Sequence, residues 1–247
     1  MSKLADAIRR SQRVEAAPIG FGAARAAPKA TMLVAAFVPN AGAVAAARER
    51  GADVVIVDAR GAGLSGPDAV SARAAAADAV LGAWLEAIGD ETAADLRLAG
   101  IDFLLFDAER TPASALLDDD MGYVLALPPD PEDNFLRAAE PLALDGLYLA
   151  SLPSPLTVAG QMSLNRVGFL SHKPLVCAVK ADAPKSDLQA LRAAGVAVVV
   201  VDGPPEGAAR LKETVLALPP RRQRREERPT LTLPRTIPPA EEEEEDE

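Results

Sequence analysis

Apolar runs separated by polar, glycine and proline residues recur along the whole chain, and three of them share one frame. In each of the three, a glycine stands seven positions before an aspartate, and mostly apolar residues fill the space between them. An Ala-, Leu- and Arg-rich stretch, typical of a helix, precedes each glycine. A glycine that ends a helix, followed by a continuous apolar run, indicates a strand buried on both faces of a sheet. The three copies are GADVVIVD at 51–58, GIDFLLFD at 100–107 and GVAVVVVD at 195–202.

The rest of the chain continues this alternation of helical and extended segments. An alternating order of strands and helices is typical of a parallel sheet, and eight such units favour closure into a (β/α)8 TIM barrel of the α/β class. An open, doubly wound sheet is the alternative topology. Strands are predicted at 31–38, 53–58, 80–86, 101–107, 122–128, 144–151, 173–180 and 196–202. Helical segments are predicted at 2–13, 41–50, 67–77, 90–99, 112–119, 131–142, 156–171, 186–195 and 205–218.

The pattern divides the chain into three regions. The first begins with an amphipathic helix that carries Leu4, Ala5 and Ile8 on its apolar face. The last is rich in proline and arginine and ends in EEEEEDE, so we expect a disordered tail that either aids solubility or engages a protein partner. The three regions are an N-terminal extension at 1–30, the barrel at 31–219 and the tail at 220–247.

Composition narrows the classes of function. Of the 247 residues, 49% are hydrophobic and only 4% aromatic, so Ala, Val and Leu must fill the core. The formal net charge is −10, but the last seven residues are all acidic, and the 240 residues before them carry only −3. No basic face indicates a nucleic-acid partner, and no apolar run is long enough for a membrane span or a signal peptide. We therefore expect a cytoplasmic protein whose single cysteine, Cys177, is a buried apolar residue.

Charged residues end several of the predicted strands, where TIM barrels carry their active sites. Clustered carboxylates at this end bind divalent cations, so a divalent metal ion is one candidate cofactor. A lysine among them, if its pKa is lowered, forms a Schiff base with a carbonyl substrate. The alternative is a rim of salt bridges in which Lys180 pairs with Asp202 or Asp58. The candidate catalytic residues are Lys180, Asp58, Glu86, Asp107 and Asp202.

The loop after the second predicted strand reads GAGLSG and has the form G-x-G-x-x-G. This pattern resembles the FAD and NAD fingerprint of dinucleotide-binding folds, in which the third glycine permits close helix packing. Three residues separate the glycine turn from the apolar run, and Pro67 follows it, so we do not expect FAD or NAD. Arg60 and the backbone amides at a helix start can instead hold a phosphate or a carboxylate. The candidate anion-binding residues are Arg60, Gly61, Gly63 and Gly66.

Part of the chain resembles the metal-dependent pyruvate aldolases of the citrate lyase β-subunit type. The similar stretches are GAW at 82–84, AGIDFLLFDAE at 99–109 and VLALPPDPEDNFLRAAEPLALDGLYL at 124–149. The resemblance implies a TIM barrel and a metal-assisted cleavage of a carbonyl substrate. The chain departs from the family where Arg110 replaces a histidine and Ala126 replaces a substrate-binding arginine. The family's Glu and Asp metal ligands are not matched either, since YLASLPSP at 148–155 lacks Gly-Pro-x-Asp.

Two functions follow from these features. The first is an aldolase-like lyase that acts on a small anionic carbonyl compound, with Lys180 or a metal ion as electrophile and Arg60 holding the anion. The second is a catalytically degenerate barrel that serves as a binding or scaffold protein. The crowded polar strand ends favour the first; the missing family residues, and the placement of the only histidine, His172, before a strand, favour the second. A flavin- or nicotinamide-dependent protein is a third hypothesis that rests on GAGLSG alone.

Overall fold

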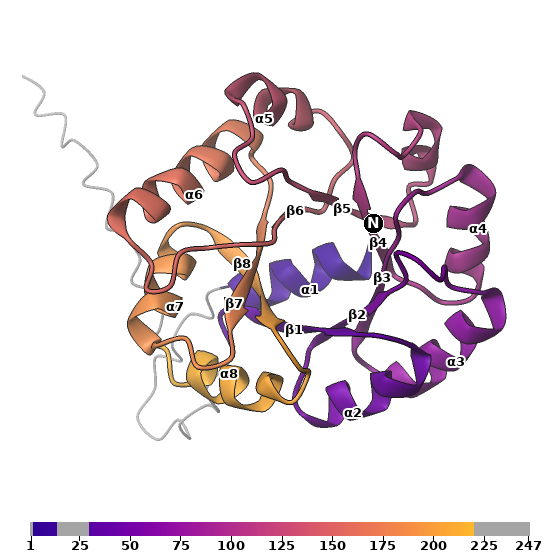
Figure 1. Cartoon of the computed structure of the whole chain (residues 1–247), viewed down its shortest axis with the longest axis horizontal. Coiled ribbons are helices and arrows are strands. Elements are labelled where there is room, and N and C mark those ends of the chain that lie inside the picture. The colour runs from indigo at the N-terminus through magenta and orange to yellow at the C-terminus, as the bar shows by residue number, and fades with distance from the viewer. Residues whose placement is uncertain (1, 14–29, 220–247) are drawn as a thin grey trace, which may run out of the picture.

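The computed structural model describes residues 2–13 and 30–219, in which eight strands form one closed barrel (Figure 1). The strands are β1 Leu33–Val38, β2 Val54–Asp58, β3 Val80–Trp84, β4 Phe103–Asp107, β5 Gly122–Ala126, β6 Gly146–Leu149, β7 Leu175–Lys180 and β8 Val196–Asp202. Each strand pairs in parallel with the next, and β8 pairs with β1 to close the ring. The predicted (β/α)8 TIM barrel is confirmed, and the open doubly wound sheet is wrong.

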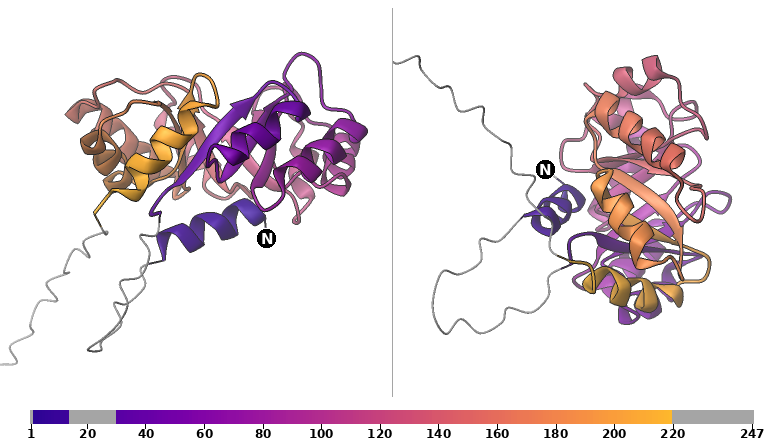
Figure 2. Two further views of the ribbon diagram at one scale, coloured as in Figure 1. Left: turned by 90° about the horizontal axis from the view of Figure 1, so that it is seen from below. Right: turned by 90° about the vertical axis from the view of Figure 1, so that its left-hand side faces the viewer.

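Helices join the strands and surround the barrel (Figures 1 and 2). They are α1 Lys3–Gln12, α2 Val44–Glu49, α3 Gly66–Ala76, α4 Asp90–Leu98, α5 Asp133–Ala139, α6 Val158–Ser171, α7 Lys185–Ala193 and α8 Gly207–Leu216. Short 3-10 turns lie at η1 Ala41–Ala43 and η2 Ala113–Leu117. Each observed strand lies within the range predicted for it, because a local apolar run defines its centre, whereas backbone pairing with both neighbours decides where it ends.

The glycine of each repeated frame ends a helix, as predicted. Gly51, Gly100 and Gly195 have φ angles of +89°, +95° and +94°, the left-handed region in which a side chain is strained. At Gly100 there is a second reason, because an added Cβ would lie 2.6 Å from the side chain of Arg73. These three positions therefore turn the chain from an outer helix into a buried strand.

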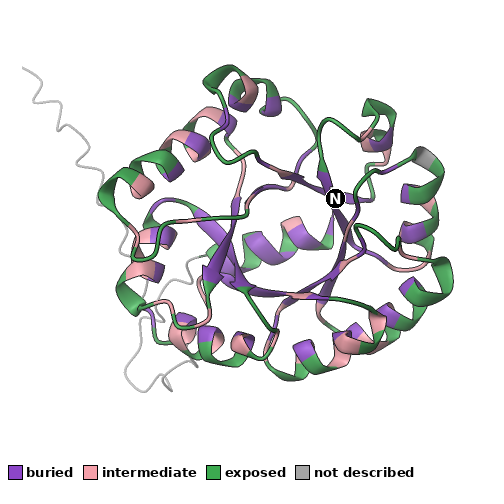
Figure 3. Ribbon diagram, viewed as in Figure 1, coloured by how far each residue is buried: buried purple, intermediate pink, exposed green. Residues whose placement is uncertain are grey.

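The strands are mostly buried (Figure 3), and two apolar clusters lie on the two faces of the barrel sheet. Side chains that point outward, such as Val55 and Leu104, pack against the surrounding helices. Side chains that point inward, such as Ile56 and Leu105, fill the barrel itself. Because successive residues of a strand alternate between these faces, the inward positions can be followed along each strand to its carboxyl end.

The helix α1 closes the end of the barrel at which the strands begin (Figures 1 and 2). Its residues Leu4, Ala7 and Ile8 belong to the same apolar cluster as the inward side chains of the strands. The predicted apolar face is thus correct for Leu4 and Ile8, whereas Ala5 is only half-buried and Ala7 is buried in its place. The beginning of the predicted N-terminal extension is therefore part of the barrel core.

Aspartates that precede two strands hold α1 in place. Asp102, directly before β4, accepts a hydrogen bond from the backbone N–H of Leu81 at 2.9 Å and pairs with Lys3 of α1 at 2.7 Å. Asp145, directly before β6, accepts a hydrogen bond from the hydroxyl of Ser2 at 2.5 Å. Burial raises the pKa of Asp145. The polar end of α1 is thus tied to the strand starts while its apolar face fills the barrel.

Two of the predicted regions lie wholly or partly outside the residues that the structure describes. The tail at 220–247 and part of the N-terminal extension, 14–29, lie outside the described residues. Within residues 2–13 and 30–219, no helix has the length and apolar character needed to cross a membrane.

Replacing Ile8 with alanine should lower the free energy of unfolding by about 2–5 kcal/mol. The reason is that its side chain is only 2% exposed and fills the barrel at the end where the strands begin. Urea denaturation followed by circular dichroism measures this change. Gln12→Ala, at an exposed position of the same helix, is the matched control and should leave the stability nearly unchanged. Equal stabilities for the two variants would contradict the place of α1 in the core.

Candidate functional site

Alternation along the strands brings four predicted catalytic residues to the carboxyl end of the barrel, here called the mouth. Each of them stands two positions after a residue of the inner apolar cluster, so its side chain faces the interior. The four are Asp58 after Ile56, Asp107 after Leu105, Lys180 after Ala178 and Asp202 after Val200. The fifth predicted residue, Glu86, lies in the loop after β3.

Three aromatic side chains form the floor of the mouth. The ring of Trp84 lies 5.1 Å from that of Phe37 and 5.3 Å from that of Tyr148, measured between ring centroids. Phe37 and Tyr148 complete the triangle at 5.8 Å with an edge-to-face arrangement. This cluster was not identified from the sequence. The available signal was the inward position of each residue near the carboxyl end of its strand.

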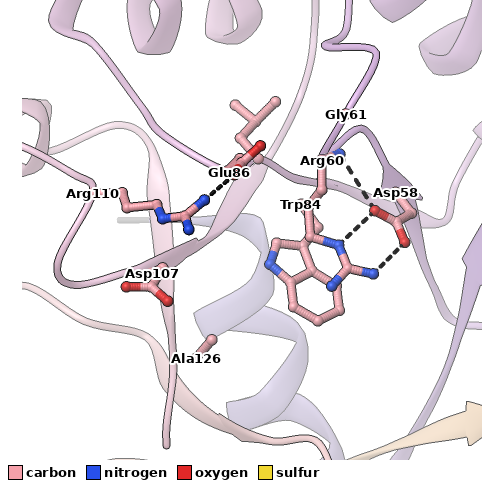
Figure 4. A pocket seen from close by; sticks show the side chains of 9 residues that line it. Asp58, Arg60, Gly61, Trp84, Glu86, Asp107, Arg110 and Ala126 are labelled. Atoms are coloured by element: carbon pink, nitrogen blue, oxygen red, sulfur yellow. Dashed lines mark hydrogen bonds and ion pairs between the residues drawn. The ribbon is translucent and has the colours of Figure 1, made fainter.

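Arg60 lies across this floor (Figure 4). Its Nε and Nη2 donate hydrogen bonds to the two carboxylate oxygens of Asp58 at 2.9 and 2.7 Å. Its guanidinium carbon lies 3.6 Å from the centroid of the Trp84 ring, which is a cation–π contact. Arg60 is therefore held by a bidentate ion pair on one side and by an aromatic face on the other.

The pairing of Arg60 and Asp58 changes the ionisation of both groups. The hydrogen bonds from Arg60 lower the pKa of Asp58, and the same bonds raise the pKa of Arg60. Because the folded-state pKa of Asp58 is lowered, the contribution of this pair to stability is complete above the ordinary pKa of 3.8 and is lost as the pH falls through the lower value.

Tyr148 is the most buried polar group of the floor. Burial raises the pKa of its phenol to about 12, because the charged phenolate would be poorly solvated there. The phenol interacts electrostatically with Arg60, Asp202, Cys177 and Asp58. Tyr148 therefore stays a neutral hydrogen-bonding group at neutral pH.

A cavity of about 530 Å³ opens on the β2 to β5 side of the mouth. Arg110 forms an ion pair with Glu86 across its rim (Figure 4). Asp107 accepts a hydrogen bond from the backbone N–H of Glu109 at 2.9 Å. This first cavity therefore holds two arginines, each already paired with a carboxylate. Its lining residues are Asp58, Arg60, Gly61, Trp84, Leu85, Glu86, Asp107, Arg110 and Ala126.

A second, smaller cavity of about 70 Å³ lies on the β7 to β8 side. Lys180 and Asp202 line it, and their Cα positions are direct partners in the pairing of β7 with β8. The loop after β6 and the helix α7 contribute apolar side chains, among them Leu156 and Leu191. Among the described residues, no carboxylate lies within 4.0 Å of the Lys180 ammonium, so the expected salt bridge to Asp202 or Asp58 is not formed.

The structure thus separates the predicted catalytic residues into two groups. Asp58, Glu86 and Asp107 surround the first cavity, whereas Lys180 and Asp202 line the second. Their distribution over opposite sides of the mouth follows from the ring order of the strands, because β2 to β4 and β7 to β8 are not neighbours.

The glycine loop is arranged differently from a dinucleotide fingerprint. Ser65 caps α3, accepting a hydrogen bond from the Asp68 backbone N–H at 3.3 Å and donating one to the Asp68 carboxylate at 2.6 Å. No atom outside its immediate neighbours lies within 4 Å of a Cβ built at Gly66, so close helix packing does not require this glycine. Of the four predicted anion-binding residues, Arg60 and Gly61 line the first cavity; Gly63 and Gly66 do not.

The metal ion implied by the aldolase resemblance does not fit the donors at the mouth. In residues 2–13 and 30–219, no three His, Cys, Asp or Glu side chains come together as a ligand set. His172 ends α6 with its Nδ1 3.2 Å from Glu140, away from the mouth. Cys177 is fully buried on the outer face of β7, and burial raises its pKa, as expected for an apolar role.

Comparison with known proteins supports the fold. No protein-family model and no curated protein sequence matches the chain. A ligand-free variant of tryptophan synthase from M. tuberculosis matches with a TM-score of 0.60 and 17% identity, covering 87% of this chain and 98% of that chain. For thiamine phosphate pyrophosphorylase from Pyrococcus furiosus the TM-score is 0.55 and the identity 16%, with 74% of this chain and 95% of that one covered.

A third structure belongs to the group that the sequence resembles. It is an HpcH/HpaI aldolase/citrate lyase family protein from Burkholderia cenocepacia J2315, with a TM-score of 0.52 and 15% identity over 75% of this chain and 93% of that chain. At such identities the likeness shows a shared TIM-barrel fold and no more. Any statement about function must therefore be argued from the residues at the mouth.

Replacing Arg60 with glutamine should raise the pKa of Asp58 towards its ordinary value, because the guanidinium hydrogen bonds hold it low. The same change should shift the fluorescence of Trp84, the only tryptophan in the chain. A carboxyl NMR titration and an emission spectrum measure the two effects. Arg110→Gln removes the other arginine of the first cavity and should change neither. An Asp58 pKa that stays low in Arg60→Gln would contradict the assigned pairing.

Proposed function

We propose that the barrel is an aldolase-like lyase that cleaves a small anionic carbonyl compound, with Lys180 as the nucleophile. The supporting observation is that Lys180 ends β7 facing the mouth and, among the described residues, has no carboxylate within 4.0 Å. Arg60 and Arg110, the other cations that line the two cavities, are each bound to a carboxylate. The amine that is not already neutralised by a partner is the group available to an incoming carbonyl.

Asp202 is the residue we assign to proton transfer with Lys180. The two residues are Cα partners on adjacent strands, which lie about 4.8 Å apart, and both side chains point to the same face of the sheet. A carboxylate at that spacing can take the proton that the ammonium must lose before it attacks, directly once substrate is bound or through a water molecule. Asp202 thus removes a proton from the Lys180 ammonium, and the resulting Lys180 amine attacks the substrate.

The reaction proceeds through covalent attachment of the substrate to the lysine. The Lys180 amine adds to the substrate carbonyl carbon, and the resulting carbinolamine loses water to form an imine. The hydroxyl on the β-carbon of the substrate loses its proton to water and becomes the carbonyl of the second product. The bond between the α- and β-carbons breaks at the same time, and its electron pair moves towards the protonated imine, which becomes an enamine. Protonation of the enamine and hydrolysis of the imine release the first product and restore the amine.

The remaining mouth residues favour a small, anionic substrate. The second cavity has a volume of only about 70 Å³, which limits the part of the substrate next to Lys180. Arg60 uses Nε and Nη2 to bind Asp58, which leaves Nη1 to donate to a substrate carboxylate. Tyr148, a neutral phenol that interacts electrostatically with both Arg60 and Asp202, can donate a hydrogen bond to a substrate bound over the floor.

A binding protein without turnover is the second candidate. It is favoured by the two ion pairs Arg60–Asp58 and Arg110–Glu86, which neutralise most of the charge around the first cavity. The aromatic floor also fills the centre of the mouth. Both features suit retention of a ligand over the floor better than a reaction on it.

Trapping the imine tests the lyase proposal. Incubation with pyruvate, as a small 2-oxo acid, followed by borohydride should attach the acid permanently to Lys180, because borohydride reduces an imine to a stable amine. Peptide mass spectrometry locates the adduct. Lys180→Ala should lose the adduct, whereas Lys185→Ala, which removes an exposed lysine at the start of α7, should retain it.

The same samples separate the two candidates. Pyruvate and longer 2-oxo acids that leave no adduct on the unmodified protein, yet change Trp84 fluorescence in a saturable way, would overturn the lyase and support the binding protein. An adduct equally strong in Lys180→Ala would show that another amine reacts and would also overturn the role of Lys180.

A further inference from the structure

One carboxylate in the first cavity has no counter-charge. Three carboxylates and two arginines line this cavity. Arg60 is bound to Asp58. Arg110 is bound to Glu86. The remaining carboxylate belongs to Asp107, and within residues 2–13 and 30–219 no side-chain nitrogen of a lysine, arginine or histidine lies within 4.0 Å of it. Figure 4 shows Asp107 without an ion pair to either arginine, so the lining as a whole keeps one negative charge.

The backbone fixes the way in which Asp107 presents its carboxylate. Asp107 ends β4, and its Oδ1 accepts the hydrogen bond from the backbone N–H of Glu109 at 2.9 Å. Among the described residues, no donor is bound to the other oxygen, Oδ2. The residue is also exposed to solvent. Asp107 therefore offers an accessible oxygen to a ligand, and little further ordering of its side chain is needed for binding.

The space beside Asp107 comes from a small residue on the next strand. The Cα of Ala126 is the direct partner of Asp107 on β4 and of Tyr148 on β6. Ala126 packs against the inner apolar cluster, to which Tyr148 belongs, so these side chains share the interior face. Because neighbouring strands lie about 4.8 Å apart, the backbones of Asp107 and Tyr148 are separated by roughly 10 Å. Only the methyl group of Ala126 occupies this interval, and Ala126 lines the first cavity.

We propose that the first cavity selects a substrate with a positively charged amine at the end remote from its carbonyl, and that Asp107 determines this specificity. The proposal rests on the proposed function for the carbonyl end, at Lys180, and it names the class of substrate: an anionic carbonyl compound with a distal ammonium group. The ammonium lies over Ala126 and donates a hydrogen bond to Oδ2 of Asp107. The carboxylate of the substrate accepts a hydrogen bond from Nη1 of Arg60.

The charge of the cavity favours an amine over the other groups that a substrate can carry at this end. A phosphate or a second carboxylate would add negative charge beside Asp107, and both arginines of the cavity are already bound to carboxylates. An apolar group would remove water from the carboxylate without replacing its hydrogen bonds. A hydroxyl would donate a hydrogen bond but leave the charge of Asp107 unbalanced. An ammonium group supplies both the donor and the opposite charge, which makes the hydrogen bond stronger.

The spacing of the two binding groups suits the two ends of a short carbon chain. Arg60 follows β2 and Asp107 ends β4, and only β3 lies between these strands. Two steps across the sheet amount to roughly 10 Å, and both side chains line the cavity between them. The first cavity, at about 530 Å³, has room for a small organic molecule, whereas the second, at about 70 Å³, admits little more than the carbonyl end. Linear ω-amino acids are therefore suitable probes of the first cavity.

Calorimetric titration of the full chain with 5-aminopentanoate tests the proposal, with 4-aminobutanoate and 6-aminohexanoate to cover the neighbouring lengths. The best of the three should bind at least about tenfold more tightly than the dicarboxylate and the monocarboxylate of the same chain length. Asp107→Asn should lower this preference to about twofold or less. Glu109→Gln is the matched control, because it removes a nearby carboxylate that does not line the cavity, and it should keep the preference.

Three results would overturn the proposal. The first is equal binding of the ω-amino acids and the two reference acids by the unmodified protein. The second is a preference that survives in Asp107→Asn. The third is a preference lost equally in Glu109→Gln, since this would show that the general negative charge of the mouth, and no particular carboxylate, attracts the amine.

A second variant tests the position of the amine. Ala126→Leu fills the interval between Asp107 and Tyr148 and should weaken the binding of 5-aminopentanoate about tenfold, with an unchanged circular dichroism spectrum. Unchanged binding by this variant would overturn the proposed position.

The probes contain no carbonyl, so their binding is independent of imine formation at Lys180. A preference for the amine that depends on Asp107, found together with no pyruvate adduct on Lys180, would overturn the lyase and support the amine site. An adduct on Lys180 without any preference for the amine would support the lyase and overturn the amine site.

Discussion

Closure of the eight-stranded sheet is the constraint on which the rest of the structure depends. In a closed barrel, every second residue of each strand points into one shared interior, and that interior must be filled from all strands at once. The alternation that buries Ile56 and Leu105 continues to Asp58 and Asp107 at the strand ends. Strand register therefore places the charged side chains together at the mouth. Whether each of them is available for chemistry depends on the groups to which it is bound.

The two ends of the barrel are closed in different ways, and this leaves one end for ligands. At the end where the strands begin, α1 adds Leu4 and Ile8 to the interior, and Asp102 and Asp145 bind its first turn. At the mouth the closure consists of aromatic rings and a stacked guanidinium, with cavities on both sides. The described residues thus close one end with a packed helix and leave cavities lined by charged side chains at the other.

The barrel and its strand ends could be predicted from the sequence because both depend on local patterns. Helix, glycine and apolar run are adjacent in the chain, and alternation carries the last strand residue inward. The aromatic floor could not be predicted, because Phe37, Trp84 and Tyr148 come from three strands that only barrel closure brings together. The function of α1 was missed for the same reason, since an amphipathic helix shows that it needs an apolar partner without showing which one.

The segment from β6 to the start of α6 connects the cavity at Lys180 to the outer helices. Its loop forms one wall of the cavity at Lys180, and the backbone N–H of Leu156 in that loop donates a hydrogen bond to Asp187 of α7 at 3.0 Å. Thr157 then caps α6 by accepting a hydrogen bond from the Gly160 backbone N–H. The loop that lines the cavity is therefore held at its far end by both outer helices, by α7 through Leu156 and by α6 through Thr157.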